Sequence, residues 1–273
     1  MPVHVRDQLD PRLSHWHFLA YAIRLLREQH GLSLTQVGRI LDVTRGTVSN
    51  FEAGRRKLGD DYARVLDGHY GTGELIQTIA FYARMSHDPD WHRTFTGYEL
   101  EALSLKIYHG QLIPGPFQTE ETIRAQLSAA RTVKDLERAV EARLLRQEAI
   151  LNREEPPYIW ALLDEAALER LTGGPKVLRA QLEHLYELSL LPNIGVRIVP
   201  RTAGAYLGTD GPMRLAVLEG REVAYLGAQR GGRLVESPGE VREVSIDWDF
   251  MSQKGYSDEE SRTLIIRKTE ALD

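Results

Sequence analysis

Apolar residues between residues 32 and 57 recur every three or four positions, which is the spacing of one face of an α-helix. The pattern comes in two short pieces, and Asp42 interrupts it between them. The stretch therefore predicts two short amphipathic helices joined by a tight turn. The apolar positions are Val37, Ile40 and Leu41 in the first piece and Val48 and Phe51 in the second.

Residues at the ends of these two pieces support the same interpretation. Ser33, followed three positions later by Gln36, is a capping box, in which each side chain bonds to the other residue's backbone N–H. Thr44 is placed to cap the second helix, and Gly38 is small enough for the two helices to cross closely. Two short helices about a tight turn make a helix-turn-helix, whose second helix is shaped to enter a major groove.

Three more helices are predicted around this pair. Ser14 can cap a first helix that runs to about residue 30 and ends at Gly31. Two others are expected over residues 60–70 and 74–85, with a glycine-containing turn between them. The sequence thus predicts an all-α five-helix domain over residues 1–85. A proline between two aspartates at 88–90 opposes a continuing helix, so we expect a linker over residues 86–95.

The remaining residues, 96–273, mix helical and strand patterns. They predict an α+β or α/β domain with a mixed sheet of four or more strands. Helices are expected over residues 98–108, 118–127, 133–152, 164–171, 175–190, 241–251 and 258–272, and strands over residues 158–163, 194–199, 213–218 and 222–226.

Charge is distributed unevenly along the chain. The net charge is −5, but residues 1–57 hold nine Lys and Arg against five Asp and Glu, a balance of +4. The remainder holds 25 against 34, a balance of −9. The positive charge lies where a DNA-facing surface would need it. The chain has no cysteine and no run of about 18 apolar residues, so we expect a cytoplasmic protein without disulfides or a membrane partner.

The polar side of the second short helix carries side chains that suit base edges. Arginine can pair with guanine, asparagine with adenine, and the threonine methyl group can meet a thymine methyl group. Three basic residues follow directly and suit phosphates. A helical hairpin with a solvated charged face is the alternative interpretation. The residues are Arg45, Gly46, Thr47, Ser49 and Asn50 in the helix, followed by Arg55, Arg56 and Lys57.

The segments IRLLREQHGLS and FEAGRRK, with the sequence between them, resemble the Xre/Cro-type helix-turn-helix family of phage repressors. The resemblance implies base-reading positions at Arg45, Thr47 and Asn50, and a structural pair, Arg27 and Glu52, between the first helix and the recognition helix. The chain departs from the family pattern at Leu34, where glutamine is usual, and at Gly46, where a reading side chain is common. We expect phosphate contacts from Ser33, Thr44, Arg55, Arg56 and Lys57.

The second half resembles the uncharacterised domain that follows an Xre-type helix-turn-helix in many actinobacterial, antitoxin-like regulators. The segments that carry this resemblance are TGYELEALSLKIYHGQLIPGPFQTEE, YIWALLDEAALERLTGGPKVLRAQLEHL and LPNIGVRIVP. The resemblance implies a regulator whose second domain binds a small-molecule effector or a small partner protein encoded nearby.

Candidate catalytic and metal-binding residues are few. Asp164 and Glu165 follow a predicted strand and suit a general base, but they also suit the cap and first turn of a helix. None of the nine histidines has metal-ligand spacing with a carboxylate, and no glycine-rich loop carries the lysine of a phosphate-binding loop. We therefore expect no catalytic residues, no metal and no cofactor.

Three hypotheses follow for function. The first is a sequence-specific transcription regulator that binds a pseudo-palindromic DNA operator as a homodimer and takes a signal through its second domain. The second is an antitoxin-like protein that sequesters a partner and binds DNA for autoregulation. The third is an enzyme with an appended helix-turn-helix, which a convergent set of acid, base and nucleophile would favour.

Overall fold

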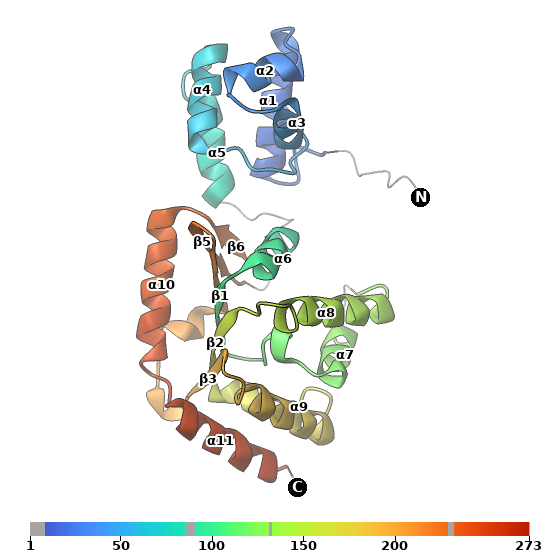
Figure 1. Ribbon diagram of the computed structural model, residues 1–273, viewed down its shortest axis with the longest axis vertical. Helices are drawn as coiled ribbons and strands as arrows, with labels where there is room; N and C mark the ends of the chain where they lie inside the picture. The colour runs from blue at the N-terminus through green and yellow to red at the C-terminus, as the bar shows by residue number, and fades with distance from the viewer. Residues whose placement is uncertain (1–8, 86–90, 131–132, 229–231, 273) are drawn as a thin grey trace. The chain divides into compact units, whose positions relative to one another are not determined.

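The computed structural model describes residues 9–85, 91–130, 133–228 and 232–272. Helices and strands divide into two compact units (Figure 1). Within the described residues, the first contains the five N-terminal helices, and the second contains the other helices and a six-stranded sheet, except for part of its last strand. An all-α N-terminal domain and a C-terminal α+β domain with a mixed sheet were the predicted fold classes, and both are confirmed.

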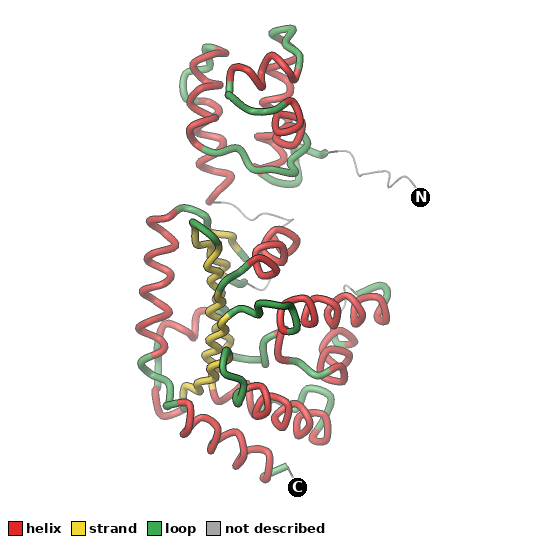
Figure 2. Tube along the Cα trace, in the orientation of Figure 1, coloured by secondary structure: helices red, strands yellow, loops and turns green. Residues whose placement is uncertain are grey.

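Residues 9–85 of the first unit form helices and loops (Figure 2). The helices are α1 (His15–Gln29), α2 (Leu34–Ile40), α3 (Arg45–Glu52), α4 (Asp60–Tyr70) and α5 (Leu75–Met85). Their apolar faces meet in one core. That core contains Leu19, Ile23, Val37, Leu41, Val48, Phe51, Leu58, Ala63, Leu66, Tyr70, Ile76, Ile79 and Ala80.

Side-chain caps fix where the first three helices begin. The Ser14 hydroxyl accepts a hydrogen bond from the His17 amide at 3.1 Å. The capping box of α2 is formed, because the Ser33 amide donates to the Gln36 side chain at 2.8 Å and the Gln36 amide donates back to the Ser33 hydroxyl at 3.3 Å. Each cap satisfies an N–H that has no partner inside its helix.

A close backbone contact defines the turn between α2 and α3. The Val43 amide donates to the Gly38 carbonyl at 2.8 Å. A Cβ atom at position 38 would lie 2.7 Å from the Val43 carbonyl oxygen, so only glycine fits there. Asp42 adopts the left-handed conformation, with φ of 53°, which aspartate tolerates better than most residues.

A buried carboxylate connects α4 to α5. The Asp67 side chain is 2% exposed and accepts hydrogen bonds from the Ile76 amide at 2.9 Å and the Gln77 amide at 3.0 Å, which belong to the first turn of α5. The Thr72 hydroxyl donates to the same carboxylate at 2.5 Å. Burial by itself raises the pKa of Asp67, but these hydrogen bonds outweigh burial and the pKa lies below its usual value.

The second unit is built on a sheet of order β3-β2-β1-β4-β5-β6. β1 is parallel to β2, and β2 is parallel to β3, whereas β4 is antiparallel to both β1 and β5. The strands are β1 (Ser104–His109), β2 (Tyr158–Asp164), β3 (Ile194–Val199), β4 (Met213–Leu218), β5 (Arg221–Leu226) and β6 (Arg233–Val235).

Helices cover both faces of the sheet (Figure 1). One face carries α7 (Glu120–Ser128), α8 (Leu136–Leu151) and α9 (Pro175–Leu188), which lie in the connections between the parallel strands. On the other face, α10 (Pro238–Ser252) packs against β4 and β5, and α11 (Asp258–Glu270) packs against β3. The element α6 (Trp91–Glu101) precedes β1.

The prediction of a helix over residues 98–108 was wrong. The helix α6 ends at Glu101, and residues 104–109 form β1. Leu105 and Ile107 are buried on one face of this strand, whereas Leu103, which the helical pattern required inside, is 55% exposed. The strand pairs with both β2 and β4, so backbone pairing on its two edges decided the conformation.

Two further differences are smaller. The helix predicted over residues 164–171 is a single 3₁₀ turn, Glu165–Leu168, and β6 was not predicted. In the expected linker, residues 86–90 lie outside the described part of the chain, and residues 91–95 belong to α6.

Candidate nucleic-acid interface

The helix α3 has one buried face and one accessible face. Val48, Phe51 and Glu52 are buried against the rest of the first unit. The opposite side carries the residues predicted to read bases: Arg45 is exposed, and Thr47 and Asn50 are half-buried. The structure therefore places these three side chains on the accessible side of one helix.

Two of the predicted contact residues are held by each other. The Thr44 hydroxyl accepts from the Thr47 amide at 3.1 Å and caps α3. The two hydroxyl oxygens are also hydrogen-bonded to each other, at 3.0 Å. Since the Thr47 hydroxyl is bound locally, its methyl group is the part that suits contact with a thymine methyl group.

Arg45 and Asn50 differ from the threonines. Within the described residues, neither the Arg45 guanidinium nor the Asn50 side-chain amide takes part in a hydrogen bond or ion pair. Both groups present several donors in a fixed planar geometry, which base edges in a major groove can match. The two side chains that are chemically best suited to reading bases thus have no hydrogen-bond or ion-pair partner within the described residues.

The three basic residues after α3 occupy different surroundings. Gly54, with φ of 65°, turns the chain, and the Arg55 and Arg56 amides donate to the Asn50 carbonyl at 2.9 Å and 3.2 Å. The Arg56 guanidinium carbon lies 5.6 Å from the centroid of the Phe51 ring. The Lys57 ammonium lies 4.9 Å from the centroid of the Trp16 ring. These aromatic rings orient the two cations without neutralising them.

Ser33 is committed to its own helix. Its hydroxyl donates to the Gln36 side-chain oxygen at 2.8 Å and accepts from the Gln36 amide at 3.3 Å. Leu34, which occupies the position where glutamine is usual in the Xre/Cro pattern, packs against the core of the first unit. The start of α2 therefore presents backbone N–H groups to a phosphate, without a free hydroxyl or a long polar side chain.

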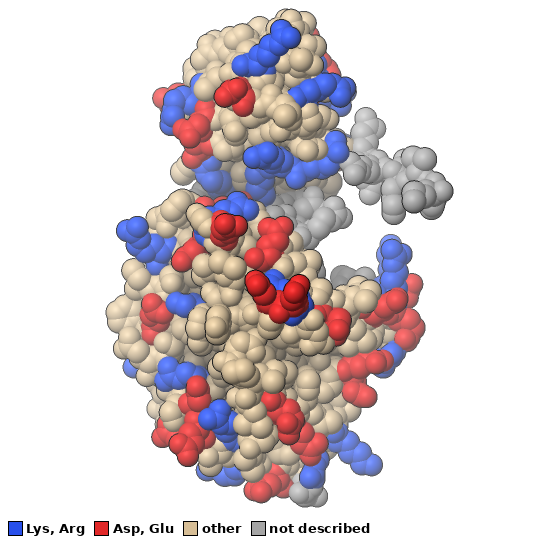
Figure 3. Space-filling view, in the orientation of Figure 1, with Lys and Arg blue, Asp and Glu red and all other residues tan. Residues whose placement is uncertain are grey.

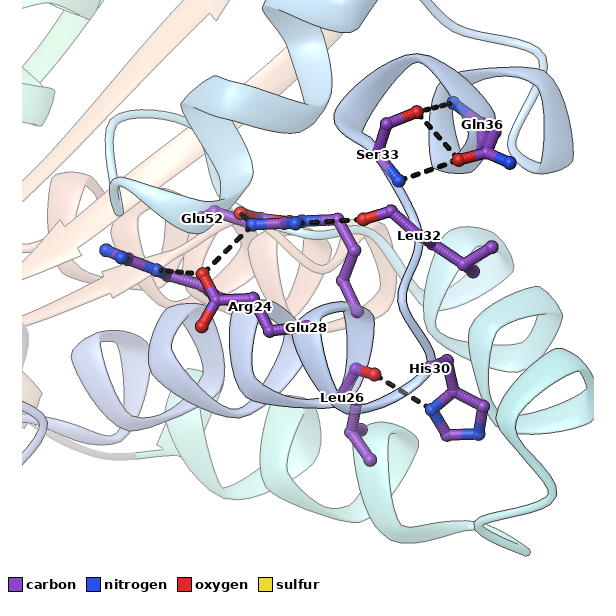
Figure 4. A network of polar contacts seen from close by, with 9 residues as sticks. Arg24, Leu26, Glu28, His30, Leu32, Ser33, Gln36 and Glu52 are labelled. Atoms are coloured by element: carbon purple, nitrogen blue, oxygen red, sulfur yellow. Dashed lines mark hydrogen bonds and ion pairs between the residues drawn. The ribbon is translucent and has the colours of Figure 1, made fainter.

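An ion pair between α1 and α3 holds α3 in place (Figure 4). The Arg27 Nε atom lies 2.6 Å from Glu52 Oε1, and Nη2 lies 2.9 Å from Oε2, so the contact is bidentate. Arg27 also donates to the Leu32 carbonyl at 2.9 Å. The side chains are 14% and 8% exposed, and the hydrogen bond to Glu52 is the largest cause of the raised pKa of Arg27.

Two residues with a clear structural role in the first unit, one beside the basic residues and one between α4 and α5, were not predicted from the sequence. Trp16 supplies the ring under Lys57, and Asp67 ties α4 to α5. The sequence carries only a weak signal for either residue, because an aromatic residue in α1 and an acidic residue in α4 both fit an ordinary amphipathic helix.

The acidic pair considered for catalysis has structural partners. The Asp164 carboxylate accepts from the Ala166 amide at 2.8 Å, which caps the 3₁₀ turn, and from the Tyr206 hydroxyl at 2.8 Å. Glu165 lies 2.7 Å from the Lys268 ammonium and accepts from the Arg201 amide at 3.0 Å. Burial raises the pKa of Glu165, but Lys268 and Arg201 together lower it by more. The pKa therefore lies below its usual value, and the group stays a carboxylate.

The described residues contain no group of three or more His, Cys, Asp or Glu residues that could hold a metal ion. None of the described helices is long and apolar enough to cross a membrane.

Comparison with known proteins gives two family matches. Residues 19–76 match a helix-turn-helix domain, and residues 92–267 match a domain of unknown function, DUF5753. No curated protein and no solved structure matches the chain. With a match that covers more than half of its residues, the chain belongs to the DUF5753 family and carries a helix-turn-helix domain ahead of that domain.

Proposed function

We propose that the protein is a sequence-specific, DNA-binding transcription regulator of the Xre/Cro type. The observation that carries this proposal is the accessible face of α3, where Arg45 and Asn50 are uncommitted within the described residues and basic residues follow directly. A face that served only solvation would not need two planar polar groups beside a cluster of basic residues. The match to a helix-turn-helix domain over residues 19–76 supports the same function.

In this proposal, specificity and anchoring come from different residues. Arg45, Thr47 and Asn50 read base edges in the major groove, and Arg55, Arg56 and Lys57 contact phosphates. The start of α2 at Ser33 and the start of α3 at Thr44 add phosphate contacts through their backbone N–H groups. The ion pair of Arg27 and Glu52 sets the angle at which α3 leaves the core.

The distribution of charge along the chain also supports DNA binding by the first unit. Residues 1–57 carry a balance of +4, and the rest of the chain carries −9. In Figure 3 the visible faces of both units carry basic and acidic side chains. The positive balance of residues 1–57 would therefore favour the approach of DNA to this part of the first unit.

We also propose that the protein binds DNA as a homodimer. One recognition helix contacts only a few base pairs, which is too little for selection among genomic sites. Two exposed aromatic side chains of α5, Phe81 and Tyr82, are 52% and 56% exposed and offer apolar surface for a second copy. On α1, Phe18, Tyr21 and Leu25 are also exposed and lie on one helical face.

The second unit is proposed to bind a small effector or a small partner protein, because a second layered domain is far larger than dimerisation of the first unit needs.

The test of sequence-specific DNA binding is selection of DNA from a random pool by the full chain. A pseudo-palindromic consensus with half-sites about 34 Å apart, or a multiple of that, is the expected result. Recovery of unselected DNA would contradict sequence-specific binding.

A further inference from the structure

A groove lies between α9 and α11 of the second unit. The two helices pack against each other, and Figure 1 shows them side by side. They run antiparallel, because Arg262, near the start of α11, donates to the carbonyl of Ser189, directly after α9, at 3.1 Å. The groove has a volume of about 140 Å³. Its lining residues are Glu183, Tyr186 and Glu187 from α9, and Ile266, Thr269 and Glu270 from α11.

The apolar part of the groove comes from both helices. The Ile266 side chain is 42% exposed, although isoleucine is among the residues most often buried, and Tyr186 is half-buried. The Thr269 hydroxyl donates to the Ile265 carbonyl at 2.9 Å, so its polar group is already used within α11. Because a cavity of about 150 Å³ holds a molecule the size of benzene, this groove has room for one long side chain.

Carboxylates supply the charge of the groove. Glu183 is paired with Arg179, one turn earlier on α9, at 3.0 Å. Glu187 and Glu270 are exposed, and their carboxylates take part in no ion pair or hydrogen bond within the described residues. None of the described residues that line the groove is Lys or Arg. The groove therefore favours a cation.

The combination of an apolar wall and uncommitted carboxylates matches one kind of side chain. Lysine and arginine pack their alkyl stems on apolar surface and keep the charged head in water. Here the stem would lie against Ile266 and Tyr186, and the head would reach Glu187 and Glu270. A cation near the Tyr186 ring would gain further from the negative face of the ring.

The exposure of the lining residues favours a polypeptide over a small molecule. Small-molecule sites enclose most of their ligand, whereas Ile266, Glu187 and Glu270 are all open to solvent. A shallow groove between two helices suits a third, amphipathic helix, which adds contacts outside the groove itself. Leu190 and Leu191, directly after α9, are 53% and 45% exposed and offer such contacts.

We propose that the groove between α9 and α11 docks a basic amphipathic helix of a partner polypeptide, which inserts one lysine or arginine side chain. Charge complementarity to Glu187 and Glu270 selects a basic segment, and Ile266 and Tyr186 select one with apolar residues beside its cations. As the partner site of a regulator, the groove rests on the proposed function, but docking itself does not.

Fluorescence anisotropy tests the docking with the full chain and a labelled helical peptide that has leucine on one face and lysine on the other. We expect saturable binding, and none when glutamate replaces the lysines. The double variant Glu187→Gln with Glu270→Gln should weaken binding by about threefold to tenfold, because open ion pairs each contribute little. Ile266→Ala should weaken it by about threefold through lost apolar contact.

Matched controls change the same residue types outside the groove. Glu141→Gln with Glu243→Gln removes two exposed carboxylates, from α8 and α10, and Ile246→Ala trims an isoleucine of α10 that is 47% exposed. Both should bind the peptide as the unmodified chain does. Absence of saturable binding, or equal losses in the groove and control variants, would overturn the proposal, because general attraction to an acidic surface gives equal losses.

Hexylamine distinguishes a small amine from a polypeptide, since it has the same stem and cationic head. It should displace the peptide only at much higher concentrations than unlabelled peptide does. Displacement at equal concentrations would identify a small-amine site and overturn polypeptide docking.

Docking and DNA recognition are measured separately, because a basic peptide binds DNA by itself. Selection of DNA by the full chain without peptide binding would remove the docking site and keep the regulator. Peptide binding that shows the expected losses in the groove variants, together with failure to select DNA, would keep the docking site and remove the regulator.

Discussion

Single side chains on α3 differ in whether the protein already uses them. Thr44 and Thr47 bond to each other, whereas Arg45 and Asn50 have uncommitted polar groups within the described residues. The sequence predicted all four as DNA contacts, because residue type and helical position are visible in it. It could not separate the committed hydroxyls from the uncommitted groups, because that depends on rotamers.

Base reading and phosphate anchoring should therefore separate by mutation. Arg45→Ala and Asn50→Ala should each weaken binding to the selected site by about 1–3 kcal/mol and leave binding to random DNA nearly unchanged. Arg55→Ala should weaken both, because phosphates carry no sequence. Binding isotherms on both kinds of DNA measure the difference.

Arg64→Ala serves as the control for lost positive charge, since Arg64 is exposed on α4 and pairs with Asp61 at 3.0 Å. It should change neither affinity by much. An Arg45→Ala variant that loses affinity equally for selected and random DNA would show that α3 does not read bases.

Two glycines of the helix-turn-helix should respond in opposite directions to the same substitution. Gly38→Ala places a Cβ atom 2.7 Å from the Val43 carbonyl oxygen, so the backbone must shift, at a cost of about 1–3 kcal/mol. At Gly46 the nearest atom to a Cβ lies at 3.7 Å, an ordinary contact. Gly46→Ala should raise the free energy of unfolding by about 1 kcal/mol through helix propensity.

Thermal or chemical unfolding of the full chain, followed by the signal of the first unit, measures both glycine variants. Each variant controls for the other, because the substitution adds the same methyl group. A Gly38→Ala protein as stable as the unmodified one would contradict the close helix crossing.

Helices and strands were predicted accurately where the local sequence pattern fitted only one kind of element. β3 and β4 have the predicted bounds, because each is a short apolar run that begins and ends near proline or glycine. β1 was missed because the apolar residues of its sequence fit a helical period as well as an alternating one. Pairing with β2 and β4, which lie more than 40 residues away along the chain, made it a strand.

The connection of α4 to α5 depends on a carboxylate and should therefore depend on pH. The pKa of Asp67 is lowered in the folded protein, so its contribution is complete above the unfolded pKa of about 3.9 and is lost as the pH falls through the folded value. Asp67→Asn should lower the stability of the first unit by about 1–3 kcal/mol at neutral pH.

The stability difference between the unmodified chain and Asp67→Asn, measured from pH 7 to pH 3, checks the sign. It should be constant near neutrality and shrink below about pH 4. Asp61→Asn is the control, because the Asp61 side chain is 92% exposed. A difference that grows with acidity would contradict the role of the Asp67 carboxylate.

For the whole molecule, the sequence predicted an all-α unit followed by an α+β unit, because helical and alternating periods occupy different halves of the chain. It did not predict the cavity that Gln118, Gln126 and Arg170 line. That cavity is formed by segments from two connections of the sheet, and only the paired strands bring them together. Local patterns therefore reveal a site on one helix more readily than a site shared among loops.

The affinity of the assembled dimer for DNA should depend strongly on salt concentration. A dimer that neutralises about six phosphates should show a log–log dependence of affinity on salt with a slope near −5.

Tyr82→Glu places charge on the exposed face of α5 and should yield a monomer that binds the selected site with lower affinity. Leu145→Glu, at a residue that is 63% exposed on α8, should stay dimeric. Mass measurement in solution, with and without the selected DNA, distinguishes these states, and a monomeric unmodified chain under both conditions would contradict two-fold recognition.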